Sequence, residues 1–213
     1  MTVELRWLGH ASFRVSHGST VVYIDPWKLT DAPQDATAVL VSHGHYDHYS
    51  PDDIAAVSNA ETVLIAPEDV ARSERNAKAI RPGETVELPG VSVTAVASYN
   101  IDKQFHPKAN NWVGFVVNIA GLRIYYAGDT DFVEEMKALG HFDVALLPVG
   151  GTYTMDAQQA SAAAQAIRPA RAIPYHWGDI VGTADDARRF AEQAGCDVTV
   201  LEPGQKLELP RQD

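Results

Sequence analysis

The sequence has little of several features that direct a protein to particular partners or compartments. It contains one cysteine, Cys196, so no disulfide can form within the chain, which suits a reducing compartment. It has 17 Lys and Arg against 28 Asp and Glu, a formal net charge of −11, and lacks the basic excess of nucleic-acid-binding proteins. No apolar run approaches the roughly 20 residues that span a bilayer, and no secretory signal is visible. We therefore expect a cytoplasmic protein with neither a nucleic-acid nor a membrane partner.

The bulk composition is that of an ordinary globular protein. Hydrophobic residues make up 46% of the 213 residues and charged residues 21%, so the chain does not have the composition of a disordered protein. A chain of this length fits one domain with a substantial core. We see no low-complexity linker and predict a single domain over residues 1–213. The composition leaves open whether the chain forms a homo-oligomer.

Alternating and β-branched runs predict many short strands. The expected strands are 3–8, 12–15, 20–24, 37–41, 62–66, 85–88, 91–97, 112–119, 123–127, 144–147, 170–173 and 198–201. Helices are expected from Pro51 and over 67–76, 132–139, 156–167 and 184–194, with Asp156 as an N-cap candidate. Strands come as meanders early and alternate with helices later, which by itself indicates only α/β or α+β. Two packed sheets with helices outside, an α+β four-layer αββα sandwich, satisfy the pattern.

The strongest motif is His43-Gly44-His45-Tyr46-Asp47-His48, directly after the largely apolar strand expected at 37–41. In an extended backbone, side chains two residues apart point the same way, so His43 and His45 can hold one metal ion. If the chain then turns, Asp47 and His48 face another side of the cavity, where a second ion fits. Gly44 lets the backbone pass close to the ions. The alternative, a polar surface loop, gives no reason for three imidazoles and a carboxylate within six residues.

Further nitrogen and oxygen ligands lie in loops beside expected strands. His106 is in the long loop before the strand at 112–119, Asp129 follows the strand at 123–127, and His176 follows the strand at 170–173. One edge of a sandwich can gather such loops. On spacing alone, a solvated loop histidine is the alternative for both His106 and His176.

These motifs, in this order and over almost the whole chain, resemble the metallo-β-lactamase superfamily. A finer resemblance is to the branch of L-ascorbate-6-phosphate lactonase and related uncharacterised metal-dependent hydrolases. That branch shares Gly9-His10-Ala11-Ser12-Phe13, Asp25-Pro26, Phe105-His106-Pro107-Lys108 and the run from Tyr125 to Asp131. The resemblance implies that His43, His45 and His106 hold one ion. It also implies that Asp47, His48 and His176 hold the other, with Asp129 bridging both.

Some features differ from other branches of the superfamily. Glyoxalase-like members carry the third histidine in a Gly-His-Thr context, whereas His106 stands between Phe105 and Pro107. Antibiotic-hydrolysing members often have a cysteine at the position matching Asp129, so a β-lactam substrate is not expected. His10 either contacts the substrate or hydrogen-bonds a metal ligand, with a packed core histidine as the alternative. Asp25 is expected to orient a ligand histidine rather than to bind an ion.

The sequence therefore predicts a metal-dependent hydrolase. Imidazole and carboxylate ligands suit two divalent transition-metal ions, Zn²⁺ first and also Mn²⁺, Fe²⁺ or Ni²⁺. A metal-bridged hydroxide would cleave a small-molecule ester, lactone or phosphoester, with turnover depending on Asp47 and Asp129. No protein nucleophile is then needed, so Ser42 is not a serine-hydrolase candidate.

Two other functions stay open. The branch also resembles N-acylphosphatidylethanolamine phospholipase D, so one alternative is a phosphodiesterase acting on a lipid or nucleotide. A lipid substrate would favour an exposed apolar lip, and the sequence shows no long apolar insertion. The other alternative is a non-hydrolytic metal-binding protein.

Overall fold

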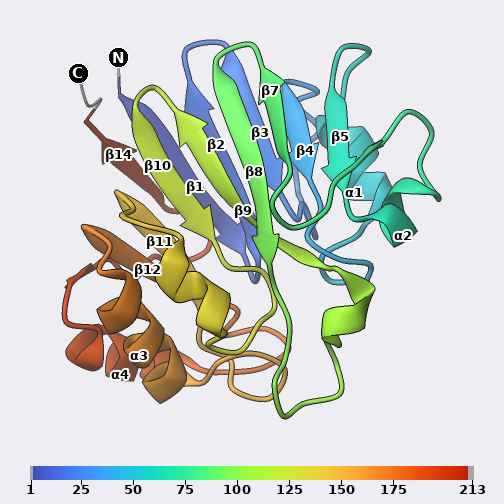
Figure 1. The fold of residues 1–213 in the computed structure, drawn as a ribbon. Helices are drawn as coiled ribbons and strands as arrows, with labels where there is room; N and C mark the ends of the chain where they lie inside the picture. Colours follow the sequence, from blue (N-terminus) through green and yellow to red (C-terminus); the bar gives the residue numbers. More distant parts are fainter. Residues whose placement is uncertain (1, 211–213) are drawn as a thin grey trace.

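The structure, a computed structural model, describes residues 2–210 and contains two β-sheets of seven strands each. The sheets face each other, and helices lie on their outer sides (Figure 1). Buried residues of both sheets, among them Phe13, Ile24, Phe115 and Tyr126, belong to one hydrophobic core. The α+β sandwich expected from the sequence is therefore confirmed.

The first sheet has the strand order β14-β1-β2-β3-β4-β5-β6. Neighbours from β14 to β3 are antiparallel, and neighbours from β3 to β6 are parallel. Its strands are β1 (Val3–Gly9), β2 (Ser12–His17), β3 (Thr20–Ile24), β4 (Ala38–Leu40), β5 (Val63–Ala66), β6 (Lys78–Ala79) and β14 (Lys206–Leu209).

The second sheet repeats this arrangement in the order β7-β8-β9-β10-β11-β12-β13. Neighbours from β7 to β10 are antiparallel, and those from β10 to β13 are parallel. Its strands are β7 (Thr85–Leu88), β8 (Val91–Ala97), β9 (Val113–Ile119), β10 (Leu122–Tyr126), β11 (Val144–Pro148), β12 (Arg171–Tyr175) and β13 (Asp197–Val198).

Helices cover the parallel part of each sheet. On the first sheet these are α1 (Pro51–Val57) and α2 (Glu68–Ala71), and on the second α3 (Ala157–Ile167) and α4 (Ala184–Gln193) (Figure 1). Strand β4 shows the consequence, because Ala38 and Leu40 belong to the main core while Val39 packs in a separate cluster with Ile54 of α1. Both faces of β4 are covered, which is why its sequence is apolar. Within residues 2–210, no helix is long and apolar enough to cross a membrane.

Several expected elements differ from the observed ones. The helix expected at 67–76 is reduced to α2, because the chain turns through a left-handed residue, Asn76 (φ 68°), to pair β6 with β5. The helix expected at 132–139 is the short 3₁₀ helix η2 (Glu134–Ala138), which precedes Gly140 with φ 83°. The strand expected at 198–201 ends at Val198. Strands β6 and β14 were not predicted from the sequence.

Candidate metal centre

The side chains singled out in the sequence come together where strands end. The segment 43–48 follows β4, Asp129 follows β10 and His176 follows β12. These strands lie in the parallel parts of the two sheets, where the carboxyl ends of neighbouring strands share an edge. His106 comes from the connection between β8 and β9, which extends below the sheets in Figure 1 and contains the 3₁₀ helix η1 (Lys108–Asn110).

One group of ligand atoms is formed by three histidines. Atoms of His43, His45 and His106 that can bind an ion all lie within 4.8 Å of one another. His43 Nε2 is 3.0 Å from His45 Nδ1, and the His106 ring centroid is 4.9 Å from each of the other two. Ligand atoms bound at about 2.0–2.1 Å around a tetrahedral Zn²⁺ are about 3.3 Å apart. The observed spacing therefore fits a shared ion.

A second group lies beside the first and contains Asp47, His48 and His176, together with His10. The chain turns after His45, whose carbonyl oxygen accepts a hydrogen bond from the His48 N–H at 3.0 Å. This turn carries Asp47 and His48 to the second group, and His48 Nε2 is 3.7 Å from Asp47 Oδ2. The histidine motif thus contributes to both groups, which adjoin each other, because ligand atoms of His43, His48 and Asp129 also lie within 4.8 Å of one another.

Asp129 lies between the two groups. Its Oδ1 is 3.3 Å from His48 Nε2, and its Oδ2 is 3.1 Å from His176 Nε2 and 3.4 Å from His106 Nε2. One carboxylate therefore faces histidines of both groups. The structure brings together all seven residues that the sequence singled out as metal ligands.

Several polar atoms at this centre have no hydrogen-bond partner within the described residues. They are His48 Nε2, His106 Nε2, Asp129 Oδ1 and both ring nitrogens of His176, and all are buried. Buried polar atoms are rarely left without partners in proteins. Imidazole nitrogens and carboxylate oxygens are also ligands that divalent transition metals accept. The convergence of these unpartnered atoms therefore fits bound ions.

Asp25 belongs to neither group of candidate ligands but hydrogen-bonds residues that do or that lie next to them. Its Oδ2 accepts hydrogen bonds from His48 Nδ1 at 2.7 Å, from the Tyr126 hydroxyl at 2.6 Å and from the Ser42 hydroxyl at 2.6 Å. Its Oδ1 accepts from the Ser42 N–H at 2.7 Å. Because Nδ1 of His48 donates to Asp25, Nε2 is free of a proton in the neutral ring and points at Asp129.

Two further histidines are oriented in the same way by residues that the sequence did not single out. His106 Nδ1 is 2.9 Å from Asn100 Oδ1, an oxygen that also accepts the His106 backbone N–H at 3.1 Å. His43 Nδ1 is 2.9 Å from the Ser42 hydroxyl. Ser42 precedes the motif, so its position was available as a signal. Asn100 had none, and Tyr126 stood only within the run from Tyr125 to Asp131, because their contacts depend on the fold.

Burial and mutual repulsion govern protonation at the centre. Burial lowers the pKa of His106 to about 4, and burial together with repulsion from His48 holds the pKa of His43 well below its usual range. Burial would raise the pKa of Asp129, but His176 and His48 lower it well below its usual range. Burial would lower the pKa of His48, but the Asp129 and Asp25 carboxylates raise it well above its usual range, so without metal this imidazole favours its protonated form. A bound ion would replace that proton, because metal ligands need neutral imidazoles beside an ionised carboxylate.

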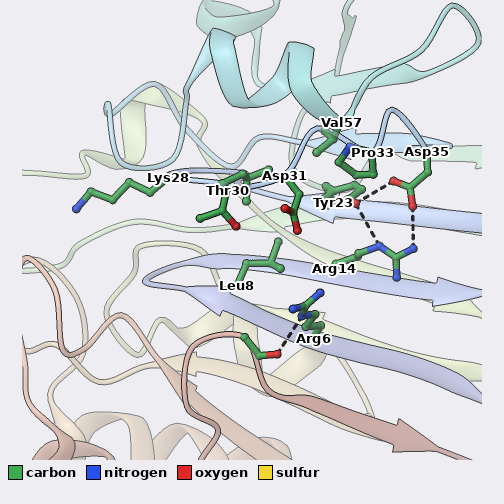
Figure 2. A pocket seen from close by; sticks show the side chains of 12 residues that line it. Arg6, Leu8, Arg14, Tyr23, Lys28, Thr30, Asp31, Pro33, Asp35 and Val57 are labelled. Atoms are coloured by element: carbon green, nitrogen blue, oxygen red, sulfur yellow. Dashed lines mark hydrogen bonds and ion pairs between the residues drawn. The ribbon is translucent and has the colours of Figure 1, made fainter.

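A cavity of about 330 Å³ lies elsewhere, on the outer face of the first sheet (Figure 2). Arg14, Tyr23 and Asp35 on its wall bind one another, with Arg14 Nη2 2.9 Å from Asp35 Oδ2 and the Tyr23 hydroxyl 2.9 Å from Asp35 Oδ1. The residues that line it include none of the seven candidate ligands. Arg14 and Asp35 pair with each other, Lys28 pairs with Asp179 and Arg6 donates to the Gly204 carbonyl, so the cavity lacks the histidine cluster of the centre.

Known proteins are similar to this chain in sequence and in fold. The family model described as beta-lactamase superfamily domain matches residues 4–176. A UPF0173 metal-dependent hydrolase of Methanoregula boonei is 36% identical over 225 residues, covering 98% of this chain and 99% of the relative. One from Pyrococcus abyssi is 33% identical over 230 residues, covering 97% and 100%.

Solved structures extend the likeness. A protein of Parabacteroides distasonis described as a metal-dependent hydrolase superposes with a TM-score of 0.83 at 29% identity, over 95% of this chain and 94% of that one. Igni18, a metallo hydrolase of Ignicoccus hospitalis, has a TM-score of 0.81 at 24% identity and covers both chains fully, which shows a shared fold.

Proposed function

Because this chain belongs to the β-lactamase superfamily, we propose that it is a hydrolase that cleaves a small ester, lactone or phosphoester with two divalent metal ions. The observation that carries the proposal is the position of Asp129. Its two carboxylate oxygens lie within 3.1–3.4 Å of three unpartnered imidazole nitrogens from different loops. A buried cluster of this kind is explained by cations that it would bind.

The two groups of side chains define the proposed ion sites. His43, His45 and His106 would hold the first ion, Asp47, His48 and His176 would hold the second, and Asp129 would face both. When bound, such ions would supply Lewis acidity and lower the pKa of a water to about 7. Zn²⁺ suits this histidine-rich set best, with Mn²⁺, Fe²⁺ or Ni²⁺ as alternatives.

The protein's own residues prepare this centre before a substrate arrives. Asp25 and Asn100 hold His48 and His106 in one tautomer, so the ligand nitrogens need not reorient. Asp129 is 3% exposed, and in such a site its negative charge offsets dications without competition from water. Preorganised charge of this kind is a main source of catalytic acceleration.

A cavity next to the centre supports a small-molecule substrate. It has a volume of about 340 Å³ and is lined by His10, Trp27 and Trp177 among others. His10 is also 3.0 Å from Asp47, so this cavity is separated from a proposed metal ligand by one imidazole. Ligand pockets for small molecules begin at about 300 Å³, and indole rings supply flat apolar walls. None of the seven candidate ligands lines this cavity, so it would hold the part of a compact substrate that lies beyond His10.

A phosphodiesterase acting on a lipid is the second candidate, and one observation favours it. The large hydrophobic side chains that are exposed in the described chain are Tyr46 (68%), Ile101 (59%) and Phe105 (45%). Tyr46 lies inside the histidine motif, and Phe105 precedes His106. An apolar surface confined to ligand-bearing segments is what a substrate with an apolar portion would contact. Such a lip was not evident from the sequence.

Metal analysis and a substrate panel test these proposals together. Protein prepared without chelator should contain about two transition-metal ions per chain by elemental analysis, because seven ligands exceed the four of one tetrahedral ion. The loaded protein is then assayed on lactones, carboxylic esters, phosphomonoesters and lipid or nucleotide phosphodiesters. Turnover confined to diesters would favour the second candidate. Two bound ions with no turnover on any member would instead support the non-hydrolytic alternative.

Trp27 provides a sharper test of the substrate cavity. The change Trp27→Ala should raise KM for the best substrate several-fold and leave the metal content at the wild-type value, because among the described residues the indole packs against the rings of His10 and Tyr46 and against no ring of the seven proposed ligands. Trp112→Ala is the matched comparison, since that indole packs at 5.0 Å from both His43 and His45. Loss of metal in the Trp27→Ala variant would mean that Trp27 supports the metal centre and would contradict a role in substrate binding alone.

A further inference from the structure

His10 lies in the connection between β1 and β2, in a backbone conformation that residues with a side chain disfavour. Its φ is 47°, in the left-handed region, and the residue is only 3% exposed. Such a conformation persists only where surrounding contacts hold it, and these residues cluster at functional sites. The contacts of His10 therefore indicate what the strained turn positions.

These contacts reach two of the three residues assigned to the second ion alone. His10 Nε2 is 3.0 Å from Asp47 Oδ2. The carbonyl oxygen of His10 accepts a hydrogen bond from the His176 N–H at 3.0 Å and from the Trp7 indole N–H at 3.0 Å. The His10 and His176 rings are also 4.1 Å apart. His10 thus connects a ligand that follows β4 of the first sheet with one that follows β12 of the second.

The hydrogen bond to Asp47 determines where the proton of the His10 ring lies. A carboxylate can only accept, so Nε2–H must be the donor. Asp47 keeps its other oxygen and its remaining lone pairs, which an ion can use. Within the described residues, His10 Nδ1 has no hydrogen-bond partner, so no second group competes for the orientation of the ring.

We propose that His10 is a positioning residue for the second metal ion. Its Nε2–H holds Asp47, and its carbonyl oxygen holds the backbone of His176, so both ligands keep the spacing that the ion needs. The inference rests on the proposed function, because it presupposes a second ion. The competing roles are direct ligation of the ion by His10 and simple packing without influence on metal binding.

Three substitutions of His10 separate these roles. Glutamine places an amide N–H three bonds from Cβ, as Nε2 is, so His10→Gln can still donate to Asp47. Asparagine places its amide one bond closer, where Nδ1 lies, so His10→Asn cannot. His10→Ala removes the side chain. An amide is a poor ligand for transition metals, so glutamine would not replace a ligating imidazole. The control is His141→Ala, because the His141 side chain is exposed outside both groups.

The measurement is a Zn²⁺ titration of each full-length variant against a competing chelator, with melting curves of the metal-free proteins to compare folding. We expect the first ion to bind as in the wild type throughout. The second ion should bind about 10–100-fold more weakly in His10→Ala and His10→Asn. It should return to within about threefold of wild type in His10→Gln. His141→Ala should match the wild type.

Each other outcome rejects the inference in a recognisable way. Wild-type affinity for the second ion in folded His10→Asn would mean that His10 only packs. Weak binding in His10→Gln, with one fewer imidazole around zinc by X-ray absorption, would make His10 a direct ligand. If His10→Ala fails to fold, the comparison of the glutamine and asparagine variants decides the question. A wild-type protein that binds one ion would instead overturn the two-ion proposal, and the role of His10 with it.

Discussion

The two halves of this molecule repeat one order of strand pairing and differ in what they attach to it. In the first half, β1 to β3 form an antiparallel meander that β4 to β6 continue as parallel strands. In the second half, β8 to β10 and β11 to β13 do the same. Strand β14 pairs with β1 as β7 pairs with β8. Matching positions in the two halves can therefore be compared directly.

An aspartate follows the third meander strand in each half, and the two have opposite surroundings. Asp25, after β3, accepts hydrogen bonds from Ser42, His48 and Tyr126, so donors satisfy both of its oxygens. Asp129, after β10, has an oxygen, Oδ1, that accepts no hydrogen bond within residues 2–210 and lies 3.3 Å from His48 Nε2. Donors within the protein satisfy the Asp25 carboxylate, whereas the Asp129 carboxylate keeps lone pairs that a metal ion could use.

The comparison shows that topological position does not decide a residue's role. Asp25 and Asp129 are almost fully buried, at 0% and 3% exposure, and each follows the carboxyl end of the third strand of its meander. The groups within hydrogen-bonding distance are what differ. Hydrogen-bond donors surround Asp25, whereas Asp129 faces ring nitrogens of His48, His106 and His176 that make no hydrogen bond within the described residues. Four substitutions test whether Asp25 orients ligands while Asp129 and Asp47 bind ions.

The largest effect is expected for Asp129→Asn. The amide keeps the size of the side chain and removes the negative charge that would offset two dications, so both ions should bind at least about 100-fold more weakly and kcat should fall with them. Elemental analysis and steady-state kinetics on the best panel substrate measure these effects. Unchanged metal affinity with unchanged kcat would remove Asp129 from the metal centre.

Asp47→Ala should be next, because Asp47 is assigned to one ion only. We expect the second ion and the turnover to be lost while the first ion stays bound, with circular dichroism and the melting curve of the metal-free protein close to wild type. The residue is 9% exposed, and in the described part of the chain its removal breaks the interactions of its side chain with His10 and His48. A folded variant that retains activity would show that this carboxylate is dispensable.

Asp25→Asn should have an intermediate effect of a different kind. The amide can no longer accept every hydrogen bond that the carboxylate takes, so the metal-free protein should lose about 1–3 kcal/mol of stability. Metal affinity should fall about 10–100-fold, because His48 is no longer fixed in its tautomer. Urea denaturation without metal separates the two effects. A stability loss with wild-type metal affinity would contradict the orienting role.

Tyr126→Phe should have the smallest effect. It removes one of the hydrogen bonds to Asp25 and leaves those from Ser42 and His48 in place. We expect a stability loss of about 0.5–1.5 kcal/mol and less than about a tenfold change in metal affinity. A larger effect on metal than that of Asp25→Asn would mean that the hydroxyl acts on the ions by another route.

Local patterns predicted the strands well and some helices poorly. The expected strands at 20–24, 85–88 and 91–97 have the observed bounds, since alternation and β-branching act over a few residues. Strand β14 was missed because its pairing joins Leu209 to Val3, across nearly the whole chain. The helix at 67–76 was overestimated because its helical composition is overridden by the turn that leads into β6.

The sequence by itself determined which side chains to expect at the candidate metal centre. Four candidate ligands occupy six consecutive residues, and the period of an extended backbone followed by a turn already divides them between two ions. Resemblance to a known superfamily supplied the remaining three. The clustering of these side chains could be predicted because ligand chemistry and short-range backbone geometry are written in neighbouring residues.

Only the tertiary structure decided which residues support the ligands. Tyr126 lies 101 positions from Asp25 in the chain, and the carbonyl of His10 meets the N–H of His176 across two sheets. Such contacts depend on strand order and sheet packing, which arise from burial summed over the whole core. A hydrogen bond between distant residues leaves no local pattern, so the roles of Asn100 and Tyr126 could be recognised only after the chain had folded, and only the contacts of His10 favour one of the roles that the sequence left open for it.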